Sequence, residues 1–128
     1  MSHTAKVVMQ FKNPRMLAKA AKALGCPCEV GEFTEGFYEG RATGGKSHGN
    51  VKIQLPNWNY PVLIDTKTGD VSYDNYNGQW GDIAELNKLS QEYGLQIAED
   101  EAQEFVLKGW SISRQKQPNG DIQLIIER

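Results

Sequence analysis

The sequence has no long apolar segment, few cysteines and no excess of positive charge. Apolar runs never exceed three residues, whereas a membrane-spanning helix needs about 20, so a transmembrane helix is excluded. Fourteen Lys and Arg stand against sixteen Asp and Glu, a net charge of −2. Because the chain lacks an overall positive field, nucleic acid would need a local basic patch.

The two cysteines, Cys26 and Cys28, are separated only by Pro27. A disulfide between them would close a ring too tight for ordinary disulfide geometry, which predicts two free thiols. A structural zinc site needs further Cys or His ligands at a regular spacing, and the only histidines, His3 and His48, are distant in sequence. We therefore predict no metal, no cofactor, and buried or half-buried side chains at both cysteines.

The chain length and the first residues further limit the domain number and the cellular location that we predict. The 128 residues match the size of one compact domain, so we predict a single domain over residues 1–128. Residues 1–6 have neither the apolar stretch of an export signal nor the Arg-rich pattern of a transit peptide. Together with the two predicted free thiols, this favours a cytoplasmic protein.

The first part of the chain predicts a strand followed by a helix. Apolar and other side chains alternate from Lys6 to Phe11, as in a strand with one buried face. Asn13 can cap a helix with its side-chain oxygen, and Pro14 suits the first helical position because its missing N–H needs no partner there. Gly25 offers a left-handed stop. The apolar stripe between them has helical spacing: Leu17, Ala20, Ala21 and Leu24.

Three further segments have strand periodicity. Val51, Ile53 and Leu55 alternate with polar residues, which predicts a strand that stops at Pro56. Residues 62–65 and 71–73 flank a short connection with a glycine near its end, typical of a hairpin with a bulge. At the C-terminus, the apolar residues 110 and 112 face those at 122, 124 and 126 across an Asn-Gly turn, the strongest short hairpin signal.

The segment between residues 82 and 108 is helical in pattern. Asp82 and Glu85 have capping-box spacing, and an apolar stripe follows. Gly94 is a candidate end, after which an acidic amphipathic stretch continues to Gly109, and the pattern does not decide between one helix and two. The order of elements predicts an α+β fold: a largely antiparallel sheet with two or three helices packed on one face and a C-terminal β-hairpin.

Residues 40–47, Gly-Arg-Ala-Thr-Gly-Gly-Lys-Ser, match the phosphate-loop pattern G-x-x-x-x-G-K-[ST]. In that motif the loop opens a helix whose amides and dipole hold the phosphates. Here Ser47 leads into the alternating segment that ends at Pro56, so we predict an extended chain after Ser47. A chance match inside a glycine-rich segment, residues 31–49, is the favoured interpretation, with either a bulged hairpin connection or a ligand-gripping loop as its structure.

Aromatic residues cluster in the middle of the chain, at Trp58, Tyr60, Tyr73, Tyr76 and Trp80. Packing in the core is the favoured role for these rings, and a protein-binding surface is the next, since Trp, Tyr and Arg are common interface anchors. Stacking of single-stranded nucleic acid is disfavoured, because four aspartates in the same region would repel phosphate. The predicted partner contacts are Arg41, Lys46, Trp58, Tyr60 and Trp80; no catalytic residue is assigned.

Several short segments also occur in one order along the chain: Met1-Ser2-His3, Lys22-Ala23-Leu24-Gly25, Gly36 to Arg41, Ile53 to Tyr60, Leu89 to Tyr93, and Asn119 to Leu124. In these segments the chain resembles the small conserved hypothetical chloroplast reading-frame proteins of cyanobacteria, algal plastids, bacteria and phages. The resemblance implies a compact domain and no particular chemistry. Occurrence in phages adds the hypothesis of a host-directed protein.

The leading hypothesis is a small non-enzymatic protein that binds another protein through the glycine-rich loop and the neighbouring aromatic residues, as an interaction or regulatory module. The alternative is a nucleic-acid-binding protein that uses the same surface. A nucleotide-binding enzyme, with Lys46 on the phosphates, is the third. The pattern sets no oligomeric state and predicts no membrane association.

Overall fold

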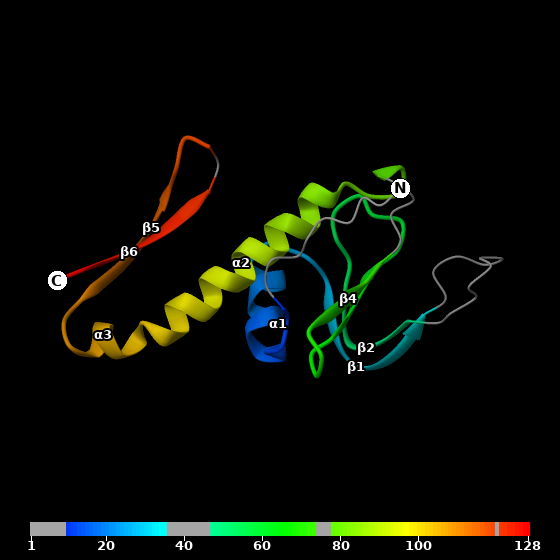
Figure 1. The fold of residues 1–128 in the computed structure, drawn as a ribbon, viewed down its shortest axis with the longest axis horizontal. Coiled ribbons are helices and arrows are strands. Elements are labelled where there is room, and N and C mark those ends of the chain that lie inside the picture. Colours follow the sequence, from blue (N-terminus) through cyan, green and yellow to red (C-terminus); the bar gives the residue numbers. More distant parts are fainter. Residues whose placement is uncertain (1–9, 36–46, 74–77, 120) are drawn as a thin grey trace. The chain divides into compact units, whose positions relative to one another are not determined.

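The computed structural model describes residues 10–35, 47–73, 78–119 and 121–128 (Figure 1). Its contacts divide the chain into two compact units, residues 1–93 and residues 94–128, which we call unit 1 and unit 2. The single domain over residues 1–128 stays a prediction. The α+β fold class is confirmed, because the chain contains helices, an antiparallel sheet and a C-terminal β-hairpin.

Unit 1 contains a four-stranded antiparallel sheet with the strand order β1-β2-β3-β4. The strands are Cys28–Glu35 (β1), Ser47–Ile53 (β2), Val62–Asp65 (β3) and Asp70–Ser72 (β4). The predicted hairpin is confirmed, since Asp65 pairs with Asp70 and Gly69 takes a φ of 85° in the turn. The alternation that predicted β2 also holds, because Val51 and Ile53 are both fully buried.

Strand β1 lies in a segment where the sequence showed little periodicity. Val30 pairs with Val51, but Phe33 pairs with Gly49, so β1 has one residue more than β2 between these pairs. The extra residue is a β-bulge, which shifts the alternation of inward and outward side chains. A period-two pattern therefore does not find this strand.

Strand β2 begins at Ser47, which confirms the extended conformation predicted after that residue. Residues 40–46 of the phosphate-loop pattern lie outside the described residues. Most of the predicted strand Lys6–Phe11 does so as well. Phe11 itself is described: it is fully buried, and its backbone N–H donates to the Gly69 carbonyl at 3.3 Å.

Helix α1 (Pro14–Ala23) has the start and the stop that the sequence predicts. The Asn13 side-chain oxygen accepts a hydrogen bond from the Met16 N–H at 3.1 Å, and Gly25 has a φ of 73°. The helix buries Met16 in addition to the predicted Leu17, Ala20 and Ala21. These side chains supply one part of the core of unit 1.

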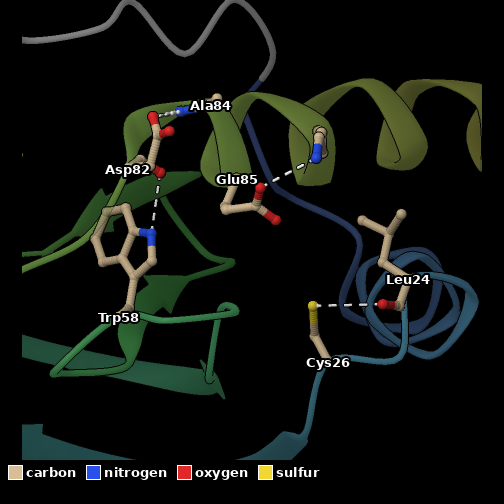
Figure 2. Close-up of polar contacts among 7 residues, drawn as sticks. Leu24, Cys26, Trp58, Asp82, Ala84 and Glu85 are labelled. Atoms are coloured by element: carbon tan, nitrogen blue, oxygen red, sulfur yellow. Dashed lines mark hydrogen bonds and ion pairs between the residues drawn. The ribbon is translucent and has the colours of Figure 1, made fainter.

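Helix α2 (Ile83–Glu101) begins where the capping pattern places it. The Asp82 carboxylate accepts from the Ala84 N–H at 2.9 Å, and the Glu85 carboxylate accepts from Lys88 Nζ at 3.0 Å (Figure 2). The helix continues through Gly94 and does not end at this candidate residue. A glycine stops a helix when it takes the left-handed conformation with positive φ. Gly94 does not have a positive φ, so the helix passes through it. A short helix α3 (Gln103–Leu107) follows.

The core of unit 1 joins α2 to the start of α1. The ring of Tyr93 meets the ring of Phe11 edge-on at a centroid distance of 4.9 Å. The Tyr93 hydroxyl accepts hydrogen bonds from the backbone N–H groups of Lys12 and Asn13 at 3.1 and 3.0 Å. Among the residues that the structure describes, the fully buried large side chains all lie in this unit: Phe11, Met16, Leu17, Ile53, Leu55, Leu63, Ile64, Leu86, Leu89, Val51 and Val62.

Unit 2 contains the end of α2, α3 and the hairpin of β5 (Ser111–Lys116) and β6 (Ile122–Glu127). The predicted hairpin is confirmed, with Ile112 opposite Ile126. Arg114 on β5 makes a two-pronged ion pair with Glu99 on α2, both N···O distances being 2.8 Å. The ion pair ties the hairpin to the end of the long helix.

Candidate functional site

An open pocket lies between the end of α1 and the start of β1, within unit 1. Its volume is about 520 Å³. The lining is mostly apolar and comes from α1, the connection after it and the first residues of β1: Ala18, Lys22, Gly25, Cys26, Pro27, Cys28 and Val30. Lys22, in the last turn of α1, is the charged member of the lining.

The pocket lies where the core face of the sheet reaches strand β1, whose side chains on that face are only partly covered by other elements. Cys28 pairs with Ile53 and Val30 pairs with Val51, and residues directly opposite each other on paired strands share a face. Since Val51 and Ile53 are fully buried, Cys28 and Val30 also belong to the core face. Val30 is nevertheless 65% exposed, which places an uncovered aliphatic side chain at the edge of the core.

Strand β1 is also an edge of the sheet. It pairs with β2 on one side, and none of the strands that the structure describes pairs with it on the other. The backbone of such an edge can accept an added strand. The bulge between Val30 and Phe33 is a device common at edges and beside binding sites. The pocket and the strand edge together therefore form one candidate groove, which we call the α1–β1 groove.

Both cysteines of the groove are free thiols, which confirms that prediction. Cys26 is buried, and its Sγ lies 3.9 Å from the Leu24 carbonyl to which it donates (Figure 2). Burial raises the pKa of Cys26 above its ordinary value of 9.0, and the Glu85 carboxylate raises it further. Burial likewise raises the pKa of Cys28, with smaller contributions from Cys26 and Glu29.

These pKa shifts define the chemistry of the thiols. At neutral pH both are protonated, and a protonated thiol is a poor nucleophile and a small apolar surface. Because the folded pKa of each thiol is raised, their contribution to stability is complete below the unfolded pKa and is lost as the pH rises through the folded value. Among the described residues, no three His, Cys, Asp or Glu side chains gather as a possible metal site.

The predicted contact residues are only partly brought together. Tyr60 is 37% exposed, and its ring meets that of the half-buried Trp80 edge-on at 5.6 Å. The backbone fixes this pair, since the Asn59 N–H donates to the Trp80 carbonyl at 2.8 Å. Arg41 and Lys46 lie outside the described residues. Tyr60 and Trp80 thus form a small aromatic surface, separate from the residues that line the α1–β1 groove.

Trp58 occupies the interior instead of the surface. It is 5% exposed, and its indole N–H donates to the Asp82 carbonyl at 3.0 Å (Figure 2). Its ring also meets the ring of Tyr73 edge-on at 5.6 Å, and burial raises the pKa of the Tyr73 hydroxyl. This aromatic residue therefore packs in the core next to the start of α2, and little of its surface is accessible to a partner.

Comparison with known proteins adds no relative: no family model, no curated protein and no solved structure matches the chain. The resemblance to the chloroplast reading-frame proteins stays a prediction from the sequence. Across the described residues, no helix combines the length and the apolar character needed to cross a membrane.

Sequence reasoning missed the α1–β1 groove. The signal that could have found it is the apolar Cys26-Pro27-Cys28 segment followed by Val30, directly after the helix stop at Gly25. A pattern of alternating residues does not reveal that β1 lies at the edge of the sheet, because strand order depends on pairings between distant segments. Val30 is exposed because β1 lies at the edge in the strand order, although valine is a residue type that is usually buried.

Proposed function

We propose that the chain is a non-enzymatic protein-binding module whose unit 1 takes an extended segment of another protein into the α1–β1 groove. The observation that carries the proposal is the 65% exposure of Val30 on the core face of an edge strand. An added strand would cover this side chain and bond the outer backbone of β1. Peptide recognition by strand addition combines these two features: backbone bonds give affinity, and side-chain pockets give specificity.

The lining of the groove sets the chemistry of the proposed partner. Ala18, Cys26 and Val30 favour an aliphatic side chain, and Lys22 favours a carboxylate near it. The bound segment is therefore an extended stretch with an aliphatic residue close to an acidic one. Tyr60 and Trp80 are retained as a second proposed contact, since aromatic side chains are common interface anchors.

The state of the thiols supports a binding role over a catalytic one. A catalytic cysteine needs a lowered pKa, whereas burial raises the pKa of Cys26 and Cys28. Two reduced thiols also suit the cytoplasmic location that we propose for the protein.

A peptide array tests the proposed function. Extended peptides carrying an aliphatic residue, with and without a neighbouring acidic residue, are probed with the wild-type chain and with Val30→Asp. We expect the substitution to weaken peptide binding by about 10- to 100-fold, because burial of a Val side chain is worth about 1.5–3 kcal/mol. The matched control is Leu107→Asp, which changes another exposed aliphatic residue, 88% exposed and in unit 2, and should leave binding unchanged.

Three results would contradict this proposal. Equal binding by the wild type and Val30→Asp would remove the groove as the site. Equal loss in Leu107→Asp would indicate a general effect of added charge. Preferential binding of a single-stranded oligonucleotide, with an affinity that falls steeply with salt, would favour the nucleic-acid alternative.

A further inference from the structure

The outer edge of strand β6 is the most apolar strand edge in unit 2. No charged residue occurs from Ile122 to Ile126, and the described residues contain no strand beyond β6 in its sheet. Strand β5, at the other edge, carries Arg114 and Lys116. Charged side chains are a usual means of preventing edge-to-edge pairing. One edge of this hairpin is therefore protected by charge, and the other is not.

The two faces of the hairpin differ in character. Ile112, Arg114 and Lys116 of β5 pair with Ile126, Leu124 and Ile122 of β6, in that order. This face carries the aliphatic side chains and, through Arg114, the ion pair with Glu99 on α2. The other face carries Ser, Gln and Glu side chains together with one aliphatic residue, the half-buried Ile125 of β6, which lies opposite Ser113 of β5.

The hairpin has little covering of its own. The buried apolar residues of unit 2 are Leu95 and Ala102, both on the helical side. Ile126 is 39% exposed, and Ile112, Ile122 and Leu124 are half-buried. A two-stranded sheet is marginally stable in water, and further strands or a helix are needed to stabilise it. Additional pairing at β6 would supply what unit 2 lacks.

We propose that β6 pairs antiparallel with β6 of a second copy of this chain. The resulting sheet has four strands, in the order β5-β6-β6-β5, with the charged strands at both outer edges. A two-fold axis makes the interface self-complementary, as in most homodimers. The second copy is the occupant that the residues of β6 favour, because the register centred on Ile125 satisfies both the faces and the charges.

The faces restrict the register to a two-fold axis that passes through a residue. An axis between two residues would join the aliphatic face of one copy to the polar face of the other, since a shift of one residue exchanges the faces. An axis at Leu124 would place Asp121 opposite Glu127 of the second copy, and like charges directly opposite are destabilising. An axis at Ile125 pairs Gln123 with Glu127, Leu124 with Ile126, and Ile125 with its own equivalent.

The axis at Ile125 also explains the aliphatic residue on the polar face. Ile125 lies opposite Ser113 within the hairpin. In the dimer it meets Ile125 of the second copy, and cross-strand pairs of β-branched residues stabilise a sheet. The aliphatic faces of the two hairpins become continuous at the same time.

Sedimentation of the full chain over a range of concentrations tests the dimer with a pair of charge variants. We expect the wild type to sediment with twice the mass of one chain. Ile125→Lys and Ile125→Glu should each weaken self-association by about 100-fold or more, because the axis sets like charges against each other. An equimolar mixture of the two variants should recover the dimer, since Lys then faces Glu.

The control is Ser113→Lys, which places the same charge on the same face but one strand away from the interface, and should leave the mass unchanged. Recovery in the mixture also shows that each variant is folded. The proposal is overturned by a wild type that stays monomeric at high concentration, by an undiminished dimer in both variants, or by a mixture of variants, folded by circular dichroism, that fails to associate.

Discussion

The two units of this chain use the same kinds of apolar residue in different ways. In unit 1, Leu86 and Leu89 of α2 are fully buried, in one core with side chains from the sheet and from α1. In unit 2, Leu107 of α3 is 88% exposed and Ile126 of β6 is 39% exposed. Burial of apolar surface is the main favourable term in folding. Unit 1 thus buries most of its large apolar side chains in one core, whereas unit 2 leaves more of its apolar surface in water.

The difference comes from the number of layers. In unit 1, helices and a four-stranded sheet give most of the apolar side chains another element to pack against, with Val30 at the α1–β1 groove as an exception. In unit 2, a two-stranded sheet and a short helix with no buried residue leave their apolar side chains partly in water. We therefore expect substitutions in unit 1 to affect stability strongly and equivalent substitutions in unit 2 to affect it weakly.

The largest expected difference is between two leucines. Leu86→Ala should lower the free energy of unfolding of unit 1 by about 2–5 kcal/mol, because it removes buried methyl groups and leaves a cavity. Leu107→Ala should change the stability by about 0.5 kcal/mol or less, as at other exposed sites. Urea unfolding followed by circular dichroism measures both. Similar losses for the two variants would refute the contrast between the units.

A smaller effect is expected where unit 1 packs most tightly. A Cβ at Gly81 would lie 2.3 Å from the Trp58 ring, so Gly81→Ala should displace the indole and lower the stability by about 1–3 kcal/mol. Gly31→Ala is the control, because its Cβ would meet the Phe33 ring at an ordinary 3.4 Å. Thermal unfolding and tryptophan fluorescence check the two variants. An unchanged melting temperature in Gly81→Ala would show that the indole can move at little cost.

The smallest effect is expected at the ion pair of unit 2. Glu99→Gln removes the carboxylate that Arg114 contacts with two N···O distances of 2.8 Å. Both side chains are partly exposed, so the loss should be at most about 1 kcal/mol and should shrink as salt is added. Hydrogen exchange of the β5 and β6 amides would show faster opening of the hairpin only. Faster exchange in the core of unit 1 as well would mean that the units are coupled.

Much of the fold could be predicted because its signals are local. Asn13, Pro14 and Gly25 define α1 through capping and backbone preference, and an Asn-Gly pair marks the turn between β5 and β6. The bulge in β1 and the continuation of α2 through Gly94 could not be predicted in this way. A bulge depends on the pairing of two strands, and a glycine inside a helix costs only about 1 kcal/mol relative to alanine, which neighbouring contacts can offset.

The candidate site was less predictable than the fold. The aromatic cluster predicted Trp58 as a partner contact. The hydrogen bond from its indole to the Asp82 carbonyl and its close approach to Gly81 place it in the core. Tyr60 and Trp80, from the same cluster, reach the surface together. Chemical type alone does not separate such residues, because a tryptophan suits a core as well as an interface.

By itself, the amino-acid sequence determined the class of fold, the ends of α1 and the turns of two hairpins, because these depend on neighbouring residues. The tertiary structure decided that β1 is an edge strand of the described sheet, that Val30 is exposed on the core face, and that unit 2 leaves its apolar residues partly uncovered. These features depend on which distant segments lie against one another. The exposure of a residue depends on which other segments pack against it, and the residue type does not specify those segments.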